Sequence, residues 1–471
     1  MTISRRHFLR QAAAVTAGFG GLRVLVLTGC SGHRFAQAGR SATASTRPDF
    51  GPLMPDPAGV FDLPEGFTYR IVSRFGDEMD DGLLVPHRPD GMAALPGPDG
   101  AVVLVCNHEV SAGRERAEGA FGPGFERARS LDPALFFDHG RAFNPAGGGT
   151  TTIVYDPATG IVVRRFLSLA GTLRNCAGGP TPWGTWITCE ESVVGPNDTF
   201  ARAHGWAFEV PATVEPGLAP PRPIEGMGRF YREAVAVDPV SSVVYQTEDR
   251  DDGLIYRFVP DVPGKLHAGG RQQALVVRDH PGLDTRNWRD GRIERGVSLP
   301  VEWVDLADVD NPEDDLRYRG FAHGAARFAR GEGMWYGNEA VYFACTNGGT
   351  ARLGQIWKYT PSRAEGTRRE YGAPGTIELF LESKSPSVLE NADNITVAPW
   401  GDLFVCEDGR DEQFLIGVTP DGETYRFGRN AVSDSELAGA TFSPDGSVLF
   451  LNIQDDGLTL AITGPWNGQA G

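Results

Sequence analysis

A short pattern recurs six times along the chain and limits the fold more than any other feature. Each copy has a turn containing Pro or Gly, then a run of β-branched or aromatic residues, then a polar end. Such runs are typical of strands, and a repeated turn and strand forms the inner hairpin of a propeller blade. The six copies lie at residues 98–109, 182–191, 239–249, 336–347, 399–408 and 444–454. The sequence therefore predicts an all-β fold, a six-bladed β-propeller with inserted loops.

The spacing of the copies indicates where the insertions lie. A four-stranded blade needs roughly 40–50 residues, and the gaps after the first and third copies are much longer. We expect loops at residues 114–149 and 266–315, covering or rimming one face of the propeller.

Several hairpins carry two polar residues fifteen positions apart. Innermost hairpins line the central channel of a propeller, and a fixed turn places such residues side by side. The pairs are Cys176 with Glu191, Glu233 with Glu248, Glu332 with Asn347, and Asp393 with Asp408. We expect these pairs to converge in the channel.

Convergence would bring many negative charges close together. They are tolerated only if cations bind there or if the pKa values of the carboxyl groups rise. Oxygen-rich sites suit Ca²⁺ or a hard trivalent ion such as Fe³⁺, and the thiolate of Cys176 favours a transition metal. The predicted metal ligands are Cys176, Glu190, Glu191, Glu233, Glu248, Glu332, Asp393 and Asp408. A simpler interpretation, solvated acidic strand ends, suits any single acidic pair. Four pairs in register are less easily explained in that way.

The other strand-end cysteines have a different interpretation. Cys106, Cys189, Cys345 and Cys406 stand one residue before the polar ends, where strand alternation turns them into the blade. We predict that these four are small core residues. Cys176 breaks their register and aligns with the acids instead.

Charge and composition narrow the function. The chain has 61 acidic and 44 basic residues and a net charge of −17, which argues against nucleic acid binding and suits bound cations. The hydrophobic fraction of 41% can form a large core. Six cysteines without a CxxC pair predict neither a disulfide framework nor a zinc ribbon.

The N-terminal segment predicts export. Arg5 and Arg6, followed by Phe8-Leu9 and a moderately apolar stretch, resemble a twin-arginine signal over residues 1–30. Residues 27–30 resemble a lipobox, in which Cys30 would be acylated. We expect residues 31–59 to form a flexible tether and residues 60–471 the propeller. The predicted product is a periplasmic or lipid-anchored monomer.

One stretch also carries a family resemblance. The segment Arg174-Asn175-Cys176-Ala177-Gly178-Gly179, continuing through residues 181–186 to Cys189-Glu190-Glu191, resembles the signature of the PhoX family of bacterial alkaline phosphatases. Residues 229–234, 331–333, 345–349 and 393–394 continue the resemblance in order. It covers most of the chain after the signal.

The resemblance implies phosphomonoester hydrolysis at an iron and calcium cluster in the channel, with small phosphomonoesters as substrates. Cys176 would bind iron, while Glu191, Glu233, Glu332 and Asp408 would complete the iron and calcium shells. Arg330 would grip the phosphate, so that Arg330, Glu332 and Cys176 are the implied catalytic residues.

Metal ions can activate the attacking water, so no serine nucleophile is required. The chain has neither a GxSxG elbow nor a Walker A loop. Two other classes stay open at this point. They are a calcium-dependent lactonase or esterase on the same fold, and a calcium-bound, non-catalytic binding module of the cell envelope.

Overall fold

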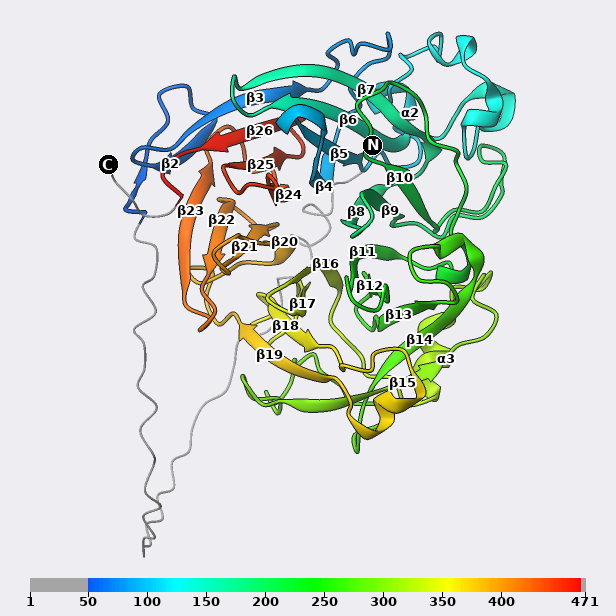
Figure 1. Ribbon diagram of the computed structural model, residues 1–471, viewed down its shortest axis with the longest axis vertical. Helices are drawn as coiled ribbons and strands as arrows, with labels where there is room; N and C mark the ends of the chain where they lie inside the picture. Colours follow the sequence, from blue (N-terminus) through cyan, green and yellow to red (C-terminus); the bar gives the residue numbers. More distant parts are fainter. Residues whose placement is uncertain (1–49, 467–471) are drawn as a thin grey trace, which may run out of the picture. The chain divides into compact units, whose positions relative to one another are not determined.

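Antiparallel sheets make up most of the regular secondary structure in the computed structural model, which describes residues 50–466 (Figure 1). The prediction of an all-β, propeller-like fold is confirmed. The strands form five hydrogen-bonded sheets rather than six separate ones, because two blade-like units share one nine-stranded sheet.

Three sheets keep to three or four strands. The first contains β4 (Pro89–Pro96), β5 (Val102–His108), β6 (Gly148–Asp156) and β7 (Ile161–Thr172). The second contains β8 (Asn175–Pro180), β9 (Thr185–Glu190) and β10 (Ala207–Pro211). The third contains β24 (Leu437–Phe442), β25 (Val448–Ile453), β26 (Leu458–Thr463) and β3 (Thr68–Arg74).

The nine-stranded sheet joins two such units at their outer edges. One unit runs from β11 (Arg232–Val237) through β12 (Val244–Glu248), β13 (Ile255–Pro260) and β14 (Gly270–Val277) to β15 (Leu299–Asp305). The other contains β16 (Gly331–Gly337), β17 (Ala340–Cys345), β18 (Gln355–Thr360) and β19 (Thr376–Glu382). Only two residue pairs of β15 and β19 make the junction.

In two sheets, N-terminal strands pair with strands from the C-terminal part of the described chain. β20 (Ala392–Val397), β21 (Leu403–Glu407), β22 (Phe414–Val418) and β23 (Thr424–Asn430) are extended by β2 (Phe61–Pro64) and β1 (Leu53–Met54). β3 likewise pairs with β26. N-terminal strands therefore fasten two C-terminal sheets.

The six innermost strands contact one another in a closed ring, in the order β4, β8, β11, β16, β20, β24 and back to β4. Small residues permit this approach. A Cβ added to Gly91 would lie 2.6 Å from the Cα of Ala177, and one added to Gly333 would lie 2.6 Å from the Cα of Asn394. Between these strands remains a cavity of only about 20 Å³. The ring is thus packed nearly solid just below the polar strand ends.

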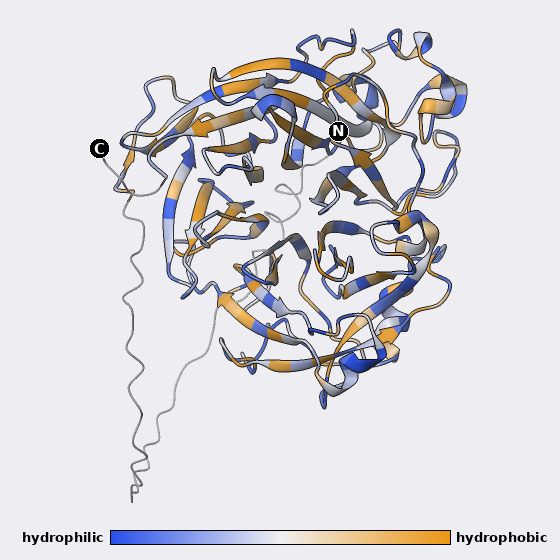
Figure 2. Cartoon of the chain, in the orientation of Figure 1, coloured by the Kyte–Doolittle hydropathy of each residue, from blue (hydrophilic) through white to orange (hydrophobic). Residues whose placement is uncertain are grey.

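Apolar side chains fill the space between neighbouring sheets, and hydrophobic residues follow the strands in each of them (Figure 2). The predicted core cysteines belong to these clusters: Cys345, Cys406, Cys106 and Cys189 are each at most 1% exposed and contact hydrophobic neighbours. Their interpretation as packing residues is confirmed.

Helices are short within residues 50–466. They are α2 (Glu115–Glu118), α3 (Leu316–Ala322) and the 3₁₀ turns η1 (Pro98–Gly100), η2 (Ala128–Ser130), η3 (Pro133–Leu135), η4 (Arg141–Phe143), η5 (Glu225–Met227), η6 (Leu266–Ala268) and η7 (Arg368–Gly372). None of these described helices is long and apolar enough to cross a membrane.

The two expected insertions differ. Residues 114–149 consist mainly of loops and short helices, as predicted, whereas residues 266–315 also contain the sheet strands β14 and β15. At the N-terminal side, β1 lies inside the expected tether and pairs with β2, so the sheet begins before residue 60. The predicted signal, Cys30 and most of the tether lie outside the described residues.

Candidate metal centre

Each of the six inner strands is interrupted by a β-bulge at the same place. In β8, for example, Asn175 and Gly178 pair with β9, and the two residues between them do not. A bulge re-aims a side chain that would otherwise follow the pleat. The first bulged residues are Asp90, Cys176, Glu233, Glu332, Asp393 and Gly439. Five of the six inner strands therefore place a metal-ligand type of side chain at one equivalent position.

The neighbouring strand of each hairpin supplies a second polar position. The residue at this second position donates its backbone N–H to the carbonyl of the residue just before the inner strand, as Glu191 does to Arg174 (2.9 Å). The equivalent residues in the first five hairpins are Glu109, Glu191, Asp249, Thr346 and Asp408. The first and second positions together gather the acids at one end of the ring.

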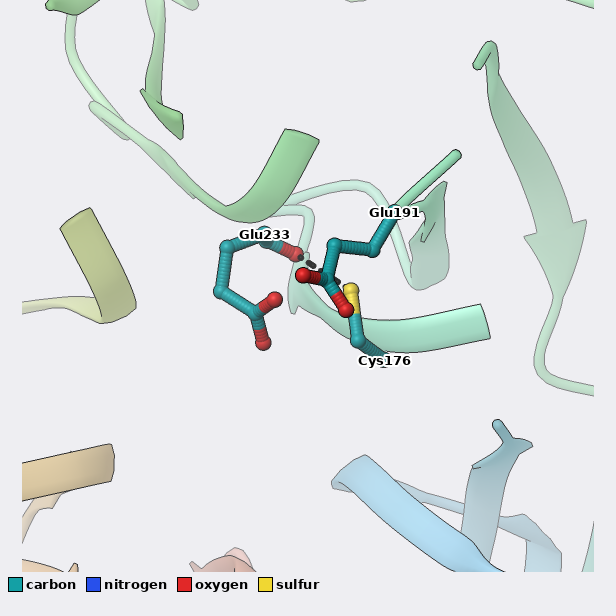
Figure 3. Close-up of side chains that lie close together, drawn as sticks. All are labelled: Cys176, Glu191 and Glu233. Atoms are coloured by element: carbon teal, nitrogen blue, oxygen red, sulfur yellow. Dashed lines mark hydrogen bonds between the residues drawn. The ribbon is translucent and has the colours of Figure 1, made fainter. Parts of the chain in front are cut away.

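Three groups of potential ligands result, in each of which one ligand atom per residue lies within 4.8 Å of the others. They are Cys176, Glu191 and Glu233; Glu233, Glu332 and Asp393; and Asp90, Glu109 and Glu436. Because Glu233 belongs to two groups, these groups are adjacent. Figure 3 shows the sulfur of Cys176 beside the carboxylate of Glu191, with the carboxylate of Glu233 directed to the same space.

The ligand group that contains the thiol of Cys176 is deeply buried. Cys176, Glu191 and Glu233 are 2–3% exposed, and the Cys176 Sγ donates to the carbonyls of Arg232 (3.4 Å) and Glu233 (3.5 Å). Burial, and then the charges of Glu233 and Glu191, hold the pKa of the Cys176 thiol well above its usual value. A thiolate here requires a neighbouring positive charge.

The carboxyl groups are under the same constraint. Burial and the nearby acids raise the pKa values of Asp90, Glu233, Glu332, Asp393 and Glu436 well above the ordinary range. The Oδ1 atom of Asp90 is buried and accepts no hydrogen bond from the residues that the structure describes. Bound cations would remove this repulsion and satisfy such oxygens. The donors fit the implied metals, since one group offers sulfur with oxygen and the other two offer oxygen alone.

Three predicted ligands, Glu190, Glu248 and Asp408, belong to none of these groups. Glu190 accepts hydrogen bonds from the backbone N–H groups of Leu173 (2.9 Å) and Gly205 (2.7 Å), and it contacts His204 Nδ1 at 2.6 Å. Glu248 accepts from the hydroxyl of Tyr256 (2.8 Å), and burial raises its pKa to about 7. Asp408 lies at the border of the third group, where its charge helps to raise the pKa of Glu436.

Four acids of the centre were missed from the sequence: Asp90, Glu109, Asp249 and Glu436. The first hairpin is longer, so Glu109 follows Asp90 by nineteen residues rather than fifteen. The third is longer by one residue, which puts Asp249 in the place expected for Glu248. Glu436 stands just before its inner strand, where Arg88, Arg174 and Arg330 stand before theirs, and its carbonyl accepts from the N–H of Gln454. Asp90, followed by Gly91 as Glu332 is by Gly333, left a signal in the sequence, and so did Glu109 and Asp249, which end the first and third copies of the repeat.

Arg330 lies beside the second group. Its Nε and Nη2 atoms donate to the two carboxylate oxygens of Asp249 (2.7 and 2.8 Å), and Nη2 also donates to Glu332 (2.8 Å). Its side chain is 28% exposed. This guanidinium is therefore fixed between two acids and can be reached from solvent.

An all-β, propeller-like protein whose central strands gather buried carboxylates around a buried thiol is a metal-binding protein of the propeller class. The chain belongs to the family described as alkaline phosphatase PhoX, whose profile matches residues 48–457. It is accordingly a metal-dependent phosphomonoesterase.

A solved structure agrees with the fold. PhoX of Pseudomonas fluorescens, determined in complex with vanadate, a transition state analogue, has 18% identity and a TM-score of 0.64, covering 86% of this chain and 96% of that one. A gluconolactonase of Xanthomonas campestris has 12% identity and a TM-score of 0.39, covering 88% and 98%. No curated protein sequence matches the chain.

Proposed function

We propose that the protein is a six-bladed propeller phosphatase that releases inorganic phosphate from small phosphomonoesters with iron and calcium at the ring centre. The closed ring of six inner strands supports a count of six blades, with the nine-stranded sheet divided at its short β15–β19 junction. Each blade then contributes one bulged strand to the centre.

The ligand group that contains Cys176 decides which metal is assigned to which group. Cys176 with Glu191 and Glu233 would hold Fe³⁺, because sulfur among carboxylates selects a transition metal over calcium. The two oxygen-only groups would hold Ca²⁺, with Asp408 at the edge of the Asp90 group. Bound there, the ions would neutralise charge on the phosphoryl group and lower the pKa of a bound water.

The chain's own part is to bind and orient the phosphate. Arg330 presents a planar guanidinium, and Asp249 fixes its orientation by accepting hydrogen bonds from Nε and Nη2. Once Glu332 binds a cation, the edge formed by Nη1 and Nη2 could donate two parallel hydrogen bonds to phosphate oxygens. The vanadate complex of the Pseudomonas fluorescens relative supports a phosphoryl-transfer site on this fold.

Export belongs to the proposal as well. The twin arginine at Arg5-Arg6 would direct the folded protein across the membrane, and Cys30 would anchor it if the lipobox is processed. The protein would act in the periplasm or at the cell envelope as a monomer.

Two cysteine variants test the function. Cys176→Ala should abolish hydrolysis of a chromogenic phosphomonoester and lower the iron content, because it removes the sulfur ligand. Cys189→Ala is the matched control, since Cys189 is equally buried but packs in the core. It should keep iron and activity. Equal losses in both variants would contradict the assignment, and so would a Cys176→Ala protein with full activity.

A further inference from the structure

An arginine precedes the ligand position by two residues in three of the six inner strands. The pairs are Arg88 with Asp90, Arg174 with Cys176, and Arg330 with Glu332. The three arginines have almost the same left-handed backbone, with φ values of 52°, 50° and 50°. Such values are uncommon outside glycine. The arginines therefore occupy one structural position, repeated around the ring.

Arg174 connects two of the ligand groups. Its Nε atom donates to Glu109 Oε1 (3.0 Å), and its Nη2 atom forms an ion pair with Glu191. Its Nη1 atom donates to the hydroxyl of Tyr231 (2.9 Å), and the side chain is only 14% exposed. One buried guanidinium thus lies between carboxylates assigned to different metals.

The other two arginines each contact one ligand group. Arg88 lies 3.4 Å from Glu109 and 4.0 Å from Glu436, at the third group. Arg330 lies 2.8 Å from Glu332, at the second. Each ligand group is therefore in contact with a guanidinium from the same backbone position.

The same carboxylate oxygens cannot be fully engaged by a guanidinium and a metal ion at once. Both bind the lone pairs of the oxygens, and the two positive charges repel each other. Without metal, however, guanidinium groups are the positive charges that contact these buried carboxylates within residues 50–466, and unpaired buried charges are strongly destabilising.

We propose that Arg88, Arg174 and Arg330 are positioning residues that compensate the ligand carboxylates in the metal-free protein. They let the centre fold in register before metal arrives and yield these contacts when cations bind. This inference rests on the proposed metal centre but not on the phosphatase activity.

Thermal unfolding of chelator-treated protein, with and without added CaCl₂, tests the proposal. Arg174→Gln should lower the melting temperature of the metal-free protein. It should also enlarge the rise produced by calcium, and tighten the calcium affinity measured by calorimetry on the order of tenfold, because a nearby repelling charge is gone. An arginine with a purely structural role would lower both melting temperatures equally.

Arg257→Gln is the matched control. Arg257 is also buried and paired with two acids, Glu365 (2.5 Å) and Glu370 (2.6 Å), which belong to none of the three groups. It should lower both melting temperatures and leave the calcium shift unchanged. Should Arg174→Gln not fold, Arg88→Gln, at a more exposed arginine, gives the same readout.

A calcium shift in Arg174→Gln that equals or falls below that of the wild type would overturn the proposal. Wild-type protein with no calcium shift would overturn the metal centre and this inference together. Loss of phosphatase activity with an enlarged calcium shift would contradict neither, and would place the failure in the catalytic step.

Discussion

Glu190 and Glu191 are neighbours in the chain and are both buried, at 0% and 2% exposure, yet they face two different regions of the molecule. Glu190 lies in a region behind β9, where backbone N–H groups and His204 surround its carboxylate. Glu191 lies at the ring centre with Cys176, Glu233 and Arg174. Burial of an acid therefore does not identify a metal ligand, and its partners do.

The region behind β9 is complete without any ligand. His204 contacts Glu190 at Nδ1 (2.6 Å) and Asp138 at Nε2 (3.3 Å). Burial alone would lower the pKa of His204, but the two carboxylates outweigh it and raise the pKa to about 9. The protein supplies its own counter-charge here, whereas at the ring centre the acids outnumber the arginines. We infer that the region around Glu190 and His204 stabilises the fold and that the ring centre binds metal.

The largest expected effect concerns Glu233, which belongs to two ligand groups. Glu233→Gln should reduce phosphomonoester hydrolysis on the order of 10³-fold, because removing one preorganised group at a charged transition state has an effect of that size. It should also lower both iron and calcium content. Activity within tenfold of the wild type would contradict the difference drawn between the two regions, because the ring centre would then tolerate the loss of its shared acid.

Glu190→Gln should show the opposite behaviour. We expect a loss of about 4 kcal/mol in the free energy of unfolding, because a buried ion pair loses one partner. Metal content should be unchanged. Denaturant titration and elemental analysis of the same preparation measure the two effects. Loss of metal without loss of stability would show that Glu190 is a ligand after all.

The smallest expected effect is the pH dependence of the His204 region. The folded pKa of His204 is raised from 6.5 to about 9. Its contribution to the free energy of unfolding is therefore complete below pH 6.5 and is lost as the pH rises through 9. The contribution amounts to about 3 kcal/mol. Unfolding titrations of wild type and His204→Gln should converge over this range. Parallel curves between pH 6.5 and 9 would mean that His204 is uncharged.

The sequence was sufficient for the repeated hairpins, because turn residues and β-formers are local signals. It also aligned Cys176 correctly with Glu233, Glu332 and Asp393, which share the bulged position. What failed was the assumption of a constant hairpin length. A shift of one residue turns a side chain to the opposite face of a strand, so Glu248 was predicted where Asp249 stands.

The side of the strand could not be predicted for Glu190 either. Strand alternation separates it from Glu191, but its partner His204 comes from a loop fourteen residues later. Glu436 precedes the last inner strand, and only the folded chain brings it to Asp90 and Glu109. Long-range contacts of this kind leave no spacing in the sequence.

Metal analysis of purified wild-type protein, together with its visible absorption spectrum, tests the central claim most directly. The account predicts both iron and calcium, and an absorption band from a thiolate bound to ferric iron that disappears in Cys176→Ala. Calcium alone, with no visible band, would contradict it.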